Sequence, residues 1–307
     1  METEPLDTYW YAICNPTSGG GIKQNKIDRI LSYLKQYQIP YQFTSTQYPH
    51  HEEDLVQRAI YKGYSKFICI GGDGTIHHMI NGIMKQTYVD TKHIKLAVLP
   101  TGTGNDWVKN YNIPKDPKKA IQLIQDNKST FQDIGKITLI DQNKVAFFNN
   151  AAGIGFDAFV VKNLSLYKKW GSLAYLIAAL SSFNSFEKSQ ISYSMDSVKM
   201  KSDIFLFSIG ICRYSGAGMQ FTDFKNHKKG YFDFTMIKSI TLLSVIKQIL
   251  KLYNGEINTV KEVTCFHMKE FKISKNDSCY IQADGELIGK GNVIFEILPD
   301  AIQFIIP

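Results

Sequence analysis

The sequence predicts an α/β protein whose first half is built on a parallel sheet and whose second half consists mostly of antiparallel strands. In residues 1–134, short β-branched or aromatic runs alternate with helical periodicity, as in a parallel sheet covered by helices. In residues 135–307, strand-like runs follow one another, which is typical of an antiparallel sandwich. A chain of 307 residues, 44% of them hydrophobic, can bury two cores, so we expect two domains, 1–134 and 135–307.

The elements of the first domain follow from their residue patterns. Apolar residues at helical spacing, such as Ile27, Ile30 and Leu34, predict helices between short apolar strands. The expected layout is Rossmann-like, and ligands of such sheets bind at the carboxyl ends of the strands. The strands are expected at Thr8–Cys14, Tyr41–Ser45, Lys66–Ile70 and Lys95–Leu99, and the helices at Ile22–Tyr37, His51–Lys62, Thr75–Lys85 and after Pro117.

The second domain is expected to be a β-sandwich interrupted by two helices, at Ser172–Phe183 and Leu242–Tyr253. The first of these helices carries an apolar stripe, which is more often part of a core than the wall of a lipid pocket. The expected strands are Lys136–Ile140, Val145–Ala152, Gln190–Ser194, Asp203–Cys212, Tyr231–Lys238, Val263–Ile273, Tyr280–Ala283, Val293–Leu298 and Ile302–Ile306.

The most distinctive segment is Gly71-Gly72-Asp73-Gly74-Thr75, which lies between a predicted strand and a predicted helix. Such a turn presents free backbone N–H groups, and its glycines lack the Cβ atoms that would keep a phosphate away. Asp73 would repel a bare phosphate, so its presence favours nucleotide chemistry with Mg²⁺ or a transferable proton between the two groups. The alternative is a tight turn whose glycines serve geometry alone.

Two further loops of similar composition follow predicted strands, at Asn15–Gly21 and Pro100–Asp106. The carboxyl ends of parallel strands lie at one edge of a sheet, so all three loops are expected to meet there. Glycine-containing loops with Ser, Thr, Asn and Asp among them predict a polyphosphate site.

Composition and charge exclude several classes of protein. The five cysteines are scattered without a Cys-x-x-Cys spacing, so we expect reduced thiols. The acidic segment Met1–Asp7 does not resemble a secretory signal, and the apolar stretch Trp170–Leu180 is shorter than the ~20 residues that cross a bilayer. The formal charge of +7 is spread out, which suits nucleotides and anionic lipid surfaces rather than nucleic acid. We expect a cytoplasmic protein, with at most peripheral contact at the inner face of the membrane.

Five ordered motifs carry a resemblance to a known family, and they cover nearly the whole chain. The block at 100–106 is more selective than Gly-Gly-Asp-Gly-Thr, which also occurs in NAD kinases and phosphofructokinases. The motifs are Asn15-Pro16-x-Ser18-Gly19, Gly71–Thr75, Pro100-x-Gly102-Thr103-x-Asn105-Asp106, Asp133-Ile-Gly135 and Asp284-Gly285-Glu286. With these motifs the chain resembles the diacylglycerol kinase catalytic-domain family, and most closely its soluble bacterial lipid kinases.

The resemblance implies a nucleotide-binding domain, a β-sandwich domain with the Asp-Gly-Glu motif and a lipid-facing surface, and an ATP site in the cleft between domains. It implies ATP and Mg²⁺ as cofactors, a lipid hydroxyl as acceptor, most often that of diacylglycerol, and a homodimer. The implied ATP-binding residues are Asn15, Pro16, Thr17, Ser18, Gly19, Thr46, Gly71, Gly72, Gly74, Thr75, Thr103, Asn105 and Asp106.

Phosphoryl transfer requires positioning, charge neutralisation and a group that accepts the nucleophile's proton. By the resemblance, Glu286 is the first candidate for that acceptor, and Asp73 and Asp284 are catalytic through Mg²⁺-linked electrostatics. The reverse assignment, with Asp73 as the base, stays open. The candidate ligands of ATP-bound Mg²⁺ are Asp73, Asp106 and Asp284.

The Asp-Gly-Glu motif permits two geometries. On an extended strand, residues two apart point to the same side, so Asp284 and Glu286 could share a face. Taken alone, however, Asp-Gly-Glu is also typical of a type I′ hairpin turn at the surface.

Two segments depart from the family pattern. His77-His78 stand where relatives commonly have Asn-Glu, and a histidine there could donate to a phosphate or lie on the solvent face. Metal ligation by these two neighbours together is not expected, because adjacent helical residues point ~100° apart. Asn226–Lys229 replaces a segment in which many bacterial relatives carry an aspartate that helps to hold a structural cation, so that cation site is in doubt.

The leading interpretation is therefore an ATP- and Mg²⁺-dependent lipid kinase that phosphorylates diacylglycerol to phosphatidic acid. An NAD kinase-like enzyme with a soluble acceptor is the second interpretation, and the blocks at 105–106 and 284–286 argue against it. A non-catalytic lipid-binding regulator on the same scaffold is the third, and the presence of every acidic candidate argues against it. The sequence identifies neither the acceptor lipid nor the oligomeric state.

Overall fold

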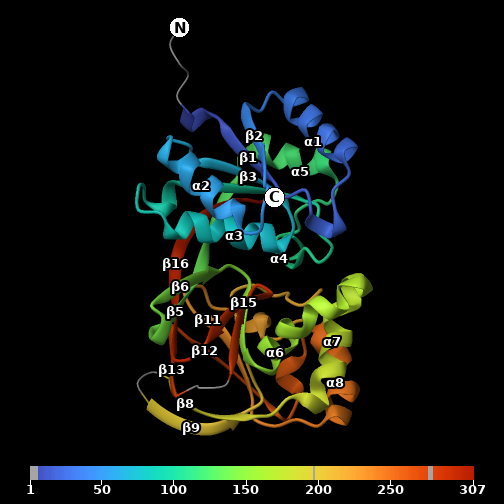
Figure 1. Cartoon of the computed structure of the whole chain (residues 1–307), viewed down its shortest axis with the longest axis vertical. Helices are drawn as coiled ribbons and strands as arrows, with labels where there is room; N and C mark the ends of the chain where they lie inside the picture. The colour runs from blue at the N-terminus through green and yellow to red at the C-terminus, as the bar shows by residue number, and fades with distance from the viewer. Residues whose placement is uncertain (1–5, 196–197, 276–278) are drawn as a thin grey trace. The chain divides into compact units, whose positions relative to one another are not determined.

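The computed structural model describes residues 6–195, 198–275 and 279–307, and the chain folds as two compact units (Figure 1). The first unit consists of the residues up to Gln132 together with Asp300–Pro307, and the second consists of Asp133–Pro299. Most of the acidic segment Met1–Asp7, on which the expectation of no export rests, lies outside the described residues.

The first unit contains a parallel sheet with strand order β2-β1-β3-β4, extended by the last residues of β16, and it confirms the expected α/β class. The four strands and the helices between them begin and end within two residues of the bounds expected from the sequence pattern. The strands are β1 (Trp10–Cys14), β2 (Tyr41–Ser45), β3 (Lys66–Gly71) and β4 (Lys95–Pro100), and the helices are α1 (Gln24–Gln36), α2 (His51–Tyr61), α3 (Asp73–Lys85), α4 (Asp106–Asn110) and α5 (Pro117–Asp126).

Helices cover both faces of this sheet (Figure 1). On one face, α1 and α5 bury Ile30, Leu34 and Ile121 against alternate strand residues such as Ile68 and Leu99. Nearly every residue of β3 and β4 is buried, as expected for the strands of a parallel sheet that is covered on both faces. The helices α2 and α3 pack against each other on the opposite face, and both begin at the sheet edge where the strands end.

The second unit is mostly antiparallel, as the sequence predicts. Its larger sheet has the order β12-β11-β10-β7-β14-β15, with antiparallel pairing throughout. A second layer is formed by β5 with β6 and by β16, β13, β8 and β9. The strands are β5 (Ser129–Leu139), β6 (Lys144–Phe148), β7 (Ala151–Gly155), β8 (Ser189–Met195), β9 (Val198–Ile204), β10 (Leu206–Gly210), β11 (Phe232–Ile237), β12 (Val263–Met268), β13 (Glu270–Lys275), β14 (Tyr280–Ala283), β15 (Glu286–Lys290) and β16 (Val293–Ile305).

Aromatic side chains fill the space between these two layers. Phe207 on β10 and Phe234 on β11 contact Phe271 on β13, at centroid separations of 4.9 and 4.7 Å. Phe271 in turn contacts Phe295 on β16. All four rings are fully buried, so this aromatic core holds the sandwich together.

The described part of the second unit contains the helices α6 (Phe156–Asn163), α7 (Ala174–Ser182) and α8 (Leu242–Asn254), and the 3-10 segment η5 (Leu164–Leu173) joins α6 to α7. The apolar residues of α6 and α7 pack with Phe205 and Leu206, so part of the stripe on the expected helix Ser172–Phe183 is core.

The structure corrects several boundaries. The run Val293–Ile306 forms one long strand rather than two, and its end, at Gln303 and Phe304, pairs in parallel with β4. The last eight residues therefore pack with the first unit, whereas the sequence pattern had assigned them to a domain at 135–307. The runs Asp203–Cys212 and Val263–Ile273 each span two strands, because an apolar pattern does not reveal where a chain reverses.

Within the described ranges, no helix combines the length and apolarity that a membrane-spanning segment needs.

Candidate active site

The three glycine loops of the first unit meet at the carboxyl edge of its sheet. The loop after β1 begins with Asn15, whose N–H donates to the carbonyl of Ile70 at 3.1 Å. The loop after β4 begins with Thr101, whose N–H donates to the carbonyl of Gly71 at 2.8 Å. The parallel register thus brings both outer loops against the Gly71–Thr75 turn.

Two of these loops are too close to admit side chains. A Cβ on Gly102 would lie 2.6 Å from the Cα of Gly72, and a Cβ on Gly72 would lie 3.0 Å from the Cα of Gly102. The hydroxyl of Ser18 lies 3.3 Å from the same Cβ position of Gly72, so the first loop takes part in the contact. Backbone surfaces without Cβ atoms expose N–H groups to a ligand, which is the property of a phosphate cradle.

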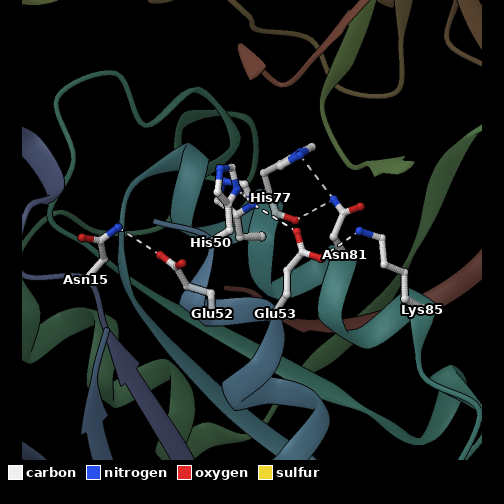
Figure 2. A network of polar contacts seen from close by, with 8 residues as sticks. Asn15, His50, Glu52, Glu53, His77, Asn81 and Lys85 are labelled. Carbon is white, nitrogen blue, oxygen red and sulfur yellow. Dashed lines mark hydrogen bonds and ion pairs between the residues drawn. The ribbon is translucent and has the colours of Figure 1, made fainter. Parts of the chain in front are cut away.

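Asn15 is held in place by a buried carboxylate. Its Nδ2 donates to Glu52 Oε1 at 3.0 Å, and its Oδ1 accepts from the Thr17 N–H at 3.0 Å and from the Thr17 hydroxyl at 2.8 Å. Glu52 lies buried in the first turn of α2, and Figure 2 shows its contact with Asn15. The Asn15 side chain therefore shapes its own loop, and its contacts are to protein groups.

Asp73 supports a neighbouring helix. Its Oδ2 accepts the N–H of Asp106 at 3.1 Å and its Oδ1 accepts the N–H of Trp107 at 3.3 Å, which satisfies two free amides at the start of α4. The Asp106 side chain is buried beside it.

Two buried polar atoms in the third loop lack a partner among the described residues: Thr101 Oγ1 and Asn105 Oδ1. Asn105 Nδ2 donates to the carbonyl of Gly102 at 2.6 Å, which fixes the direction of the amide. Asn105 Oδ1 lies 2.8 Å from the Cβ position of Gly102 and so faces the glycine contact. Buried acceptors without partners are costly, and a ligand donor would satisfy them.

The remaining candidates of the first unit lie in the same loops or next to them. Thr75 is buried and packs so closely on Gly71 that a Cβ there would collide with it. Thr46 is buried after β2, and its N–H donates to the carbonyl of Cys14 at 2.9 Å. The candidates Pro16, Ser18 and Gly74 are partly exposed, while Thr17, Gly19 and Thr103 are exposed.

In the second unit, Asp284 and Gly285 form the two-residue turn between β14 and β15. Both have positive φ angles, 51° and 84°, and Ala283 pairs with Glu286 across the turn. This is the type I′ geometry that the sequence allowed as the alternative for Asp-Gly-Glu. The expectation that Asp284 and Glu286 share one face of an extended strand is therefore wrong, because the chain reverses between them.

The Asp284 carboxylate lies in a nest of backbone amides. It accepts from the N–H groups of Asn149, Asn150 and Ala151 at 3.0 to 3.1 Å. Since a carboxylate offers about four acceptor positions, most of its capacity is used inside the protein. These bonds hold the hairpin turn against the segment that enters β7.

Glu286 begins β15 and its side chain is half-buried. Within the part of the chain that the structure describes, its carboxylate has no hydrogen-bond or ion-pair partner. Of the two acidic residues of the motif, Glu286 is thus the one whose carboxylate is available to a ligand.

A buried polar network contacts the Asp284–Gly285 turn and helps to hold it in place. Gln282 Nε2 donates to Asp157 Oδ2 at 2.6 Å, while Gln282 Oε1 accepts the Gly285 N–H at 3.1 Å. Asp157 also accepts the hydroxyl of Tyr175. Burial raises the pKa of Asp157, and the hydrogen bonds from Tyr175 and Gln282 act to lower it. Tyr175, Asp157 and Gln282 therefore link α7 and α6 to the Asp-Gly-Glu turn.

The segments that depart from the family pattern also have definite partners. His77 is buried and contacts Asn81, with 3.3 Å between His77 Nε2 and Asn81 Nδ2, so the expectation of a solvent-facing His77 is wrong. Asp133 Oδ2 accepts the Gly230 N–H at 2.6 Å, directly after the segment 226–229. His227 in that segment contacts the buried Asp233, with 2.7 Å between Nδ1 and Oδ2. A histidine–carboxylate pair therefore occupies the region where a structural cation was in doubt.

An apolar pocket lies in the second unit between α7, α8 and the larger sheet. Its lining is almost entirely aliphatic and aromatic, and it includes Tyr175, Leu176, Ile249 and Leu252. Tyr175 belongs both to this pocket and to the Asp157 network. The expected helix Ser172–Phe183 is thus core on one side and pocket wall on another.

Sequence reasoning missed Glu52, Asp157, Tyr175 and Gln282. Glu52 lies in an acidic helix start that is typical of a solvated first turn, and Gln282 and Asp157 belong to no motif. A possible signal was Gly153 in β7, since a Cβ there would collide with Asp157.

Comparison with known proteins places both halves of the chain. Residues 9–137 match the diacylglycerol kinase catalytic domain, and residues 150–306 match the YegS C-terminal NAD kinase beta sandwich-like domain. A Bacillus subtilis (strain 168) protein, provisionally named lipid kinase YtlR, is 26% identical over 305 residues, covering 92% of this chain and 94% of that protein. A diacylglycerol kinase of Mycobacterium tuberculosis (strain CDC 1551 / Oshkosh) is 25% identical over 301 residues, covering 96% of this chain and 94% of its own.

A crystal structure of a diacylglycerol kinase from Bacillus anthracis str. Sterne has the same fold, with a TM-score of 0.71 at 18% identity, covering 98% of this chain and 97% of that one. The two matched domains and this fold define an enzyme of the kinase class. The chain therefore combines a diacylglycerol kinase catalytic domain with a YegS C-terminal NAD kinase beta sandwich-like domain, which confirms the resemblance found in the sequence.

Proposed function

We propose that the protein is an ATP-dependent lipid kinase that transfers the γ-phosphate to a lipid hydroxyl, with diacylglycerol as the acceptor and phosphatidic acid as the product. The observation that carries the proposal is the contact between Gly72 and Gly102, which leaves no room for side chains where two loops meet. The names of the relatives, lipid kinase and diacylglycerol kinase, support the choice of acceptor.

In this proposal ATP is held by the three loops of the first unit. The start of α3 supplies unbonded amides and the positive end of the helix dipole to the phosphates. Asn105 Oδ1 and Thr101 Oγ1 are buried acceptors suited to the hydroxyl or amino groups of a nucleoside. The implied ATP residues are Asn15, Pro16, Thr17, Ser18, Gly19, Thr46, Gly71, Gly72, Gly74, Thr75, Thr103, Asn105 and Asp106, with Asn15 acting through the shape of its loop.

Asp73 and Asp106 fit a role in holding the magnesium ion that accompanies ATP. Both lie beside the glycine loops, and carboxylate oxygens are ligands that Mg²⁺ prefers. When bound, Mg²⁺ neutralises phosphate charge. Asp284 fits this role less well, because three backbone amides already occupy its carboxylate.

Glu286 is the proposed proton acceptor. As the acceptor oxygen forms its bond to the γ-phosphorus, the bond from that phosphorus to the β,γ-bridging oxygen breaks and ADP leaves. The hydroxyl proton passes to the Glu286 carboxylate, whose availability supports this assignment over Asp284. Asp284 and Gln282 then act as positioning residues that fix the turn preceding Glu286.

The second unit offers a place for acyl chains and a surface for lipid. The pocket beside Tyr175 is apolar enough to take a hydrocarbon chain. On the exposed side of α8, Leu243, Ile246 and Leu250 are 61%, 52% and 71% exposed and lie along one stripe, with Lys247 beside them. An apolar stripe next to lysine suits peripheral contact with an anionic membrane such as the inner face of the cytoplasmic membrane.

The test is transfer of labelled γ-phosphate from ATP to a panel that contains diacylglycerol, ceramide, sphingosine and NAD. Label in phosphatidic acid, with at least ~100-fold slower transfer by Asp73→Ala and Glu286→Ala, is expected for groups that act on the transition state. Label in NAD instead would favour a kinase for a soluble acceptor. Absence of label in every acceptor, with ATP bound, would favour a non-catalytic regulator.

A further inference from the structure

Two histidines and a glutamate meet where α2 and α3 pack together, and none of the three is among the residues assigned to ATP or to catalysis above. His50 precedes α2 and Glu53 lies in its first turn (Figure 2), while His78 belongs to α3. The Nδ1 atoms of His50 and His78 are 3.2 Å apart, and His78 Nδ1 is 3.3 Å from Glu53 Oε1. All three atoms lie within 4.8 Å of one another.

Two of the three separations match those of a tetrahedral metal site. Zinc–nitrogen and zinc–oxygen bonds of about 2.0–2.1 Å at tetrahedral angles place neighbouring ligand atoms about 3.3–3.4 Å apart. The two shorter separations in the cluster, 3.2 and 3.3 Å, are close to this value.

Hydrogen bonds among the three side chains do not satisfy all three ligand atoms. If His78 Nδ1 carries a hydrogen, that hydrogen must serve both the Glu53 oxygen and the lone pair of His50. If His50 carries the hydrogen instead, the bare His78 nitrogen faces a carboxylate.

The surrounding structure holds the three side chains in place. Gly82 lets α2 and α3 approach, since a Cβ there would lie 2.9 Å from the Glu53 carbonyl oxygen, and His78 is one helical turn from Gly82. His50 has a φ of 64°, a left-handed conformation that a histidine adopts only at a cost. Lys85 Nζ binds the other oxygen of Glu53 at 2.7 Å, which orients Oε1 toward His78 as outer-shell partners of metal ligands do.

We propose that His50, Glu53 and His78 form a binding site for a divalent first-row transition metal, with Zn²⁺ as the best fit. Two imidazole nitrogens and one carboxylate oxygen are the donor set that Zn²⁺ accepts in three-ligand sites, with the fourth position open to water or an anion. Mg²⁺ and Ca²⁺ prefer oxygen ligands and fit it poorly. The ion would join the start of α2 to α3, the helix that follows the Gly71–Thr75 turn.

The experiment is a titration of the untagged, metal-stripped full-length chain with Co²⁺, followed by visible absorption, and with Zn²⁺, followed by calorimetry. The wild type is expected to bind a single cation, to give the absorption of tetrahedral Co²⁺ and to lose it when Zn²⁺ is added. His50→Asn, His78→Gln and Glu53→Gln should each weaken Co²⁺ binding at least ~10-fold, as expected when one of three ligands is removed. His93→Asn, at an exposed histidine of the same unit, should bind like the wild type.

The choice of His50→Asn keeps the test decisive. His50 is exposed and asparagine tolerates a left-handed backbone, so this variant should fold even if His78→Gln does not. Unchanged Co²⁺ affinity in His50→Asn, or absence of Co²⁺ and Zn²⁺ binding by the wild type, would overturn the proposal. Neither readout uses phosphoryl transfer, so failure of the kinase proposal would leave this result intact.

Discussion

The Cα atom of Gly72 lies 2.6 Å from the position that a Cβ on Gly102 would occupy. Gly72 directly follows β3 and Gly102 follows β4, so this single approach joins two of the loops assigned to ATP. Backbone atoms on both sides make the contact rigid, because no flexible side chain is available to move.

Gly102→Ala is therefore expected to weaken ATP binding at least ~10-fold and to destabilise the protein by about 1–3 kcal/mol, as overpacking against backbone does. Calorimetric titration with ATP and urea unfolding measure the two effects. Gly63→Ala is the control, since Gly63 has a φ of 101° with nothing within 4 Å of its Cβ position. It should lose stability while keeping ATP affinity, and the same pattern in Gly102→Ala would contradict the assignment of the cradle.

Gln282→Leu should lower kcat with little change in the KM for ATP. The substitution removes the donor to Asp157 and the acceptor for the Gly285 N–H, so it frees the turn that precedes Glu286. Loss of one partner from a buried carboxyl also costs about 1–3 kcal/mol of stability. Steady-state kinetics and urea unfolding of the same variant separate the effect on kcat from the effect on stability. An unchanged kcat in a destabilised variant would show that the network of Tyr175, Asp157 and Gln282 has only a structural role.

Glu53 should make the protein sensitive to acid. The pKa of its carboxyl falls from 4.5 to about 2 on folding, because hydrogen bonds from His78 and Lys85 outweigh the effect of burial. A depressed folded-state pKa means that the stabilisation is complete above pH 4.5 and is lost as the pH falls toward about 2. Urea midpoints measured across this range should fall less steeply for Glu53→Gln than for the wild type. In the control Asp28→Asn, at an exposed carboxylate of α1, the urea midpoint should fall with pH as steeply as in the wild type. If the midpoint of Glu53→Gln falls equally steeply, Glu53 is not the source of the acid sensitivity.

Replacing Leu243, Ile246 and Leu250 together by serine should reduce binding to anionic phospholipid vesicles at least ~10-fold, since burial of each leucine or isoleucine is worth about 1.5–3 kcal/mol. The side chains are exposed, so the fold should survive. Vesicle sedimentation measures the change. As a control, a variant in which the exposed Tyr61 and Tyr88 are both replaced by serine should bind vesicles as the wild type does. Equal losses of vesicle binding in the two variants would argue against α8 as the membrane contact.

Much of the first unit follows from local patterns. Strands with continuous apolar runs and helices with regular apolar spacing were placed to within two residues, and the parallel order then required their glycine loops to share one edge. Asp73 shows the limit of this reasoning. Its bonds to the amides of α4 could not be foreseen, because a helix of five residues has too little periodicity to be recognised.

The second unit was harder to predict because its chain reversals depend on contacts between residues far apart in the sequence. The split between β12 and β13 leaves no turn residue in the sequence, and β15 does not follow from the pattern because Asp-Gly-Glu fits both an extended strand and a type I′ turn. Glu52 and Asp157 were missed for another reason: a buried carboxylate has the same local sequence signal as an exposed one, and its partners are far away in the chain.

The central claim is that Glu286 accepts the hydroxyl proton and takes no part in ATP binding. It is tested most directly by Glu286→Gln, with Glu270→Gln, at an exposed glutamate of the same unit, as the control. The measurement is ATP affinity by calorimetry together with the rate of label transfer to diacylglycerol. Glu286→Gln should bind ATP like the wild type and transfer phosphate at least ~100-fold more slowly, while Glu270→Gln matches the wild type in both. Transfer by Glu286→Gln at the wild-type rate would contradict the account.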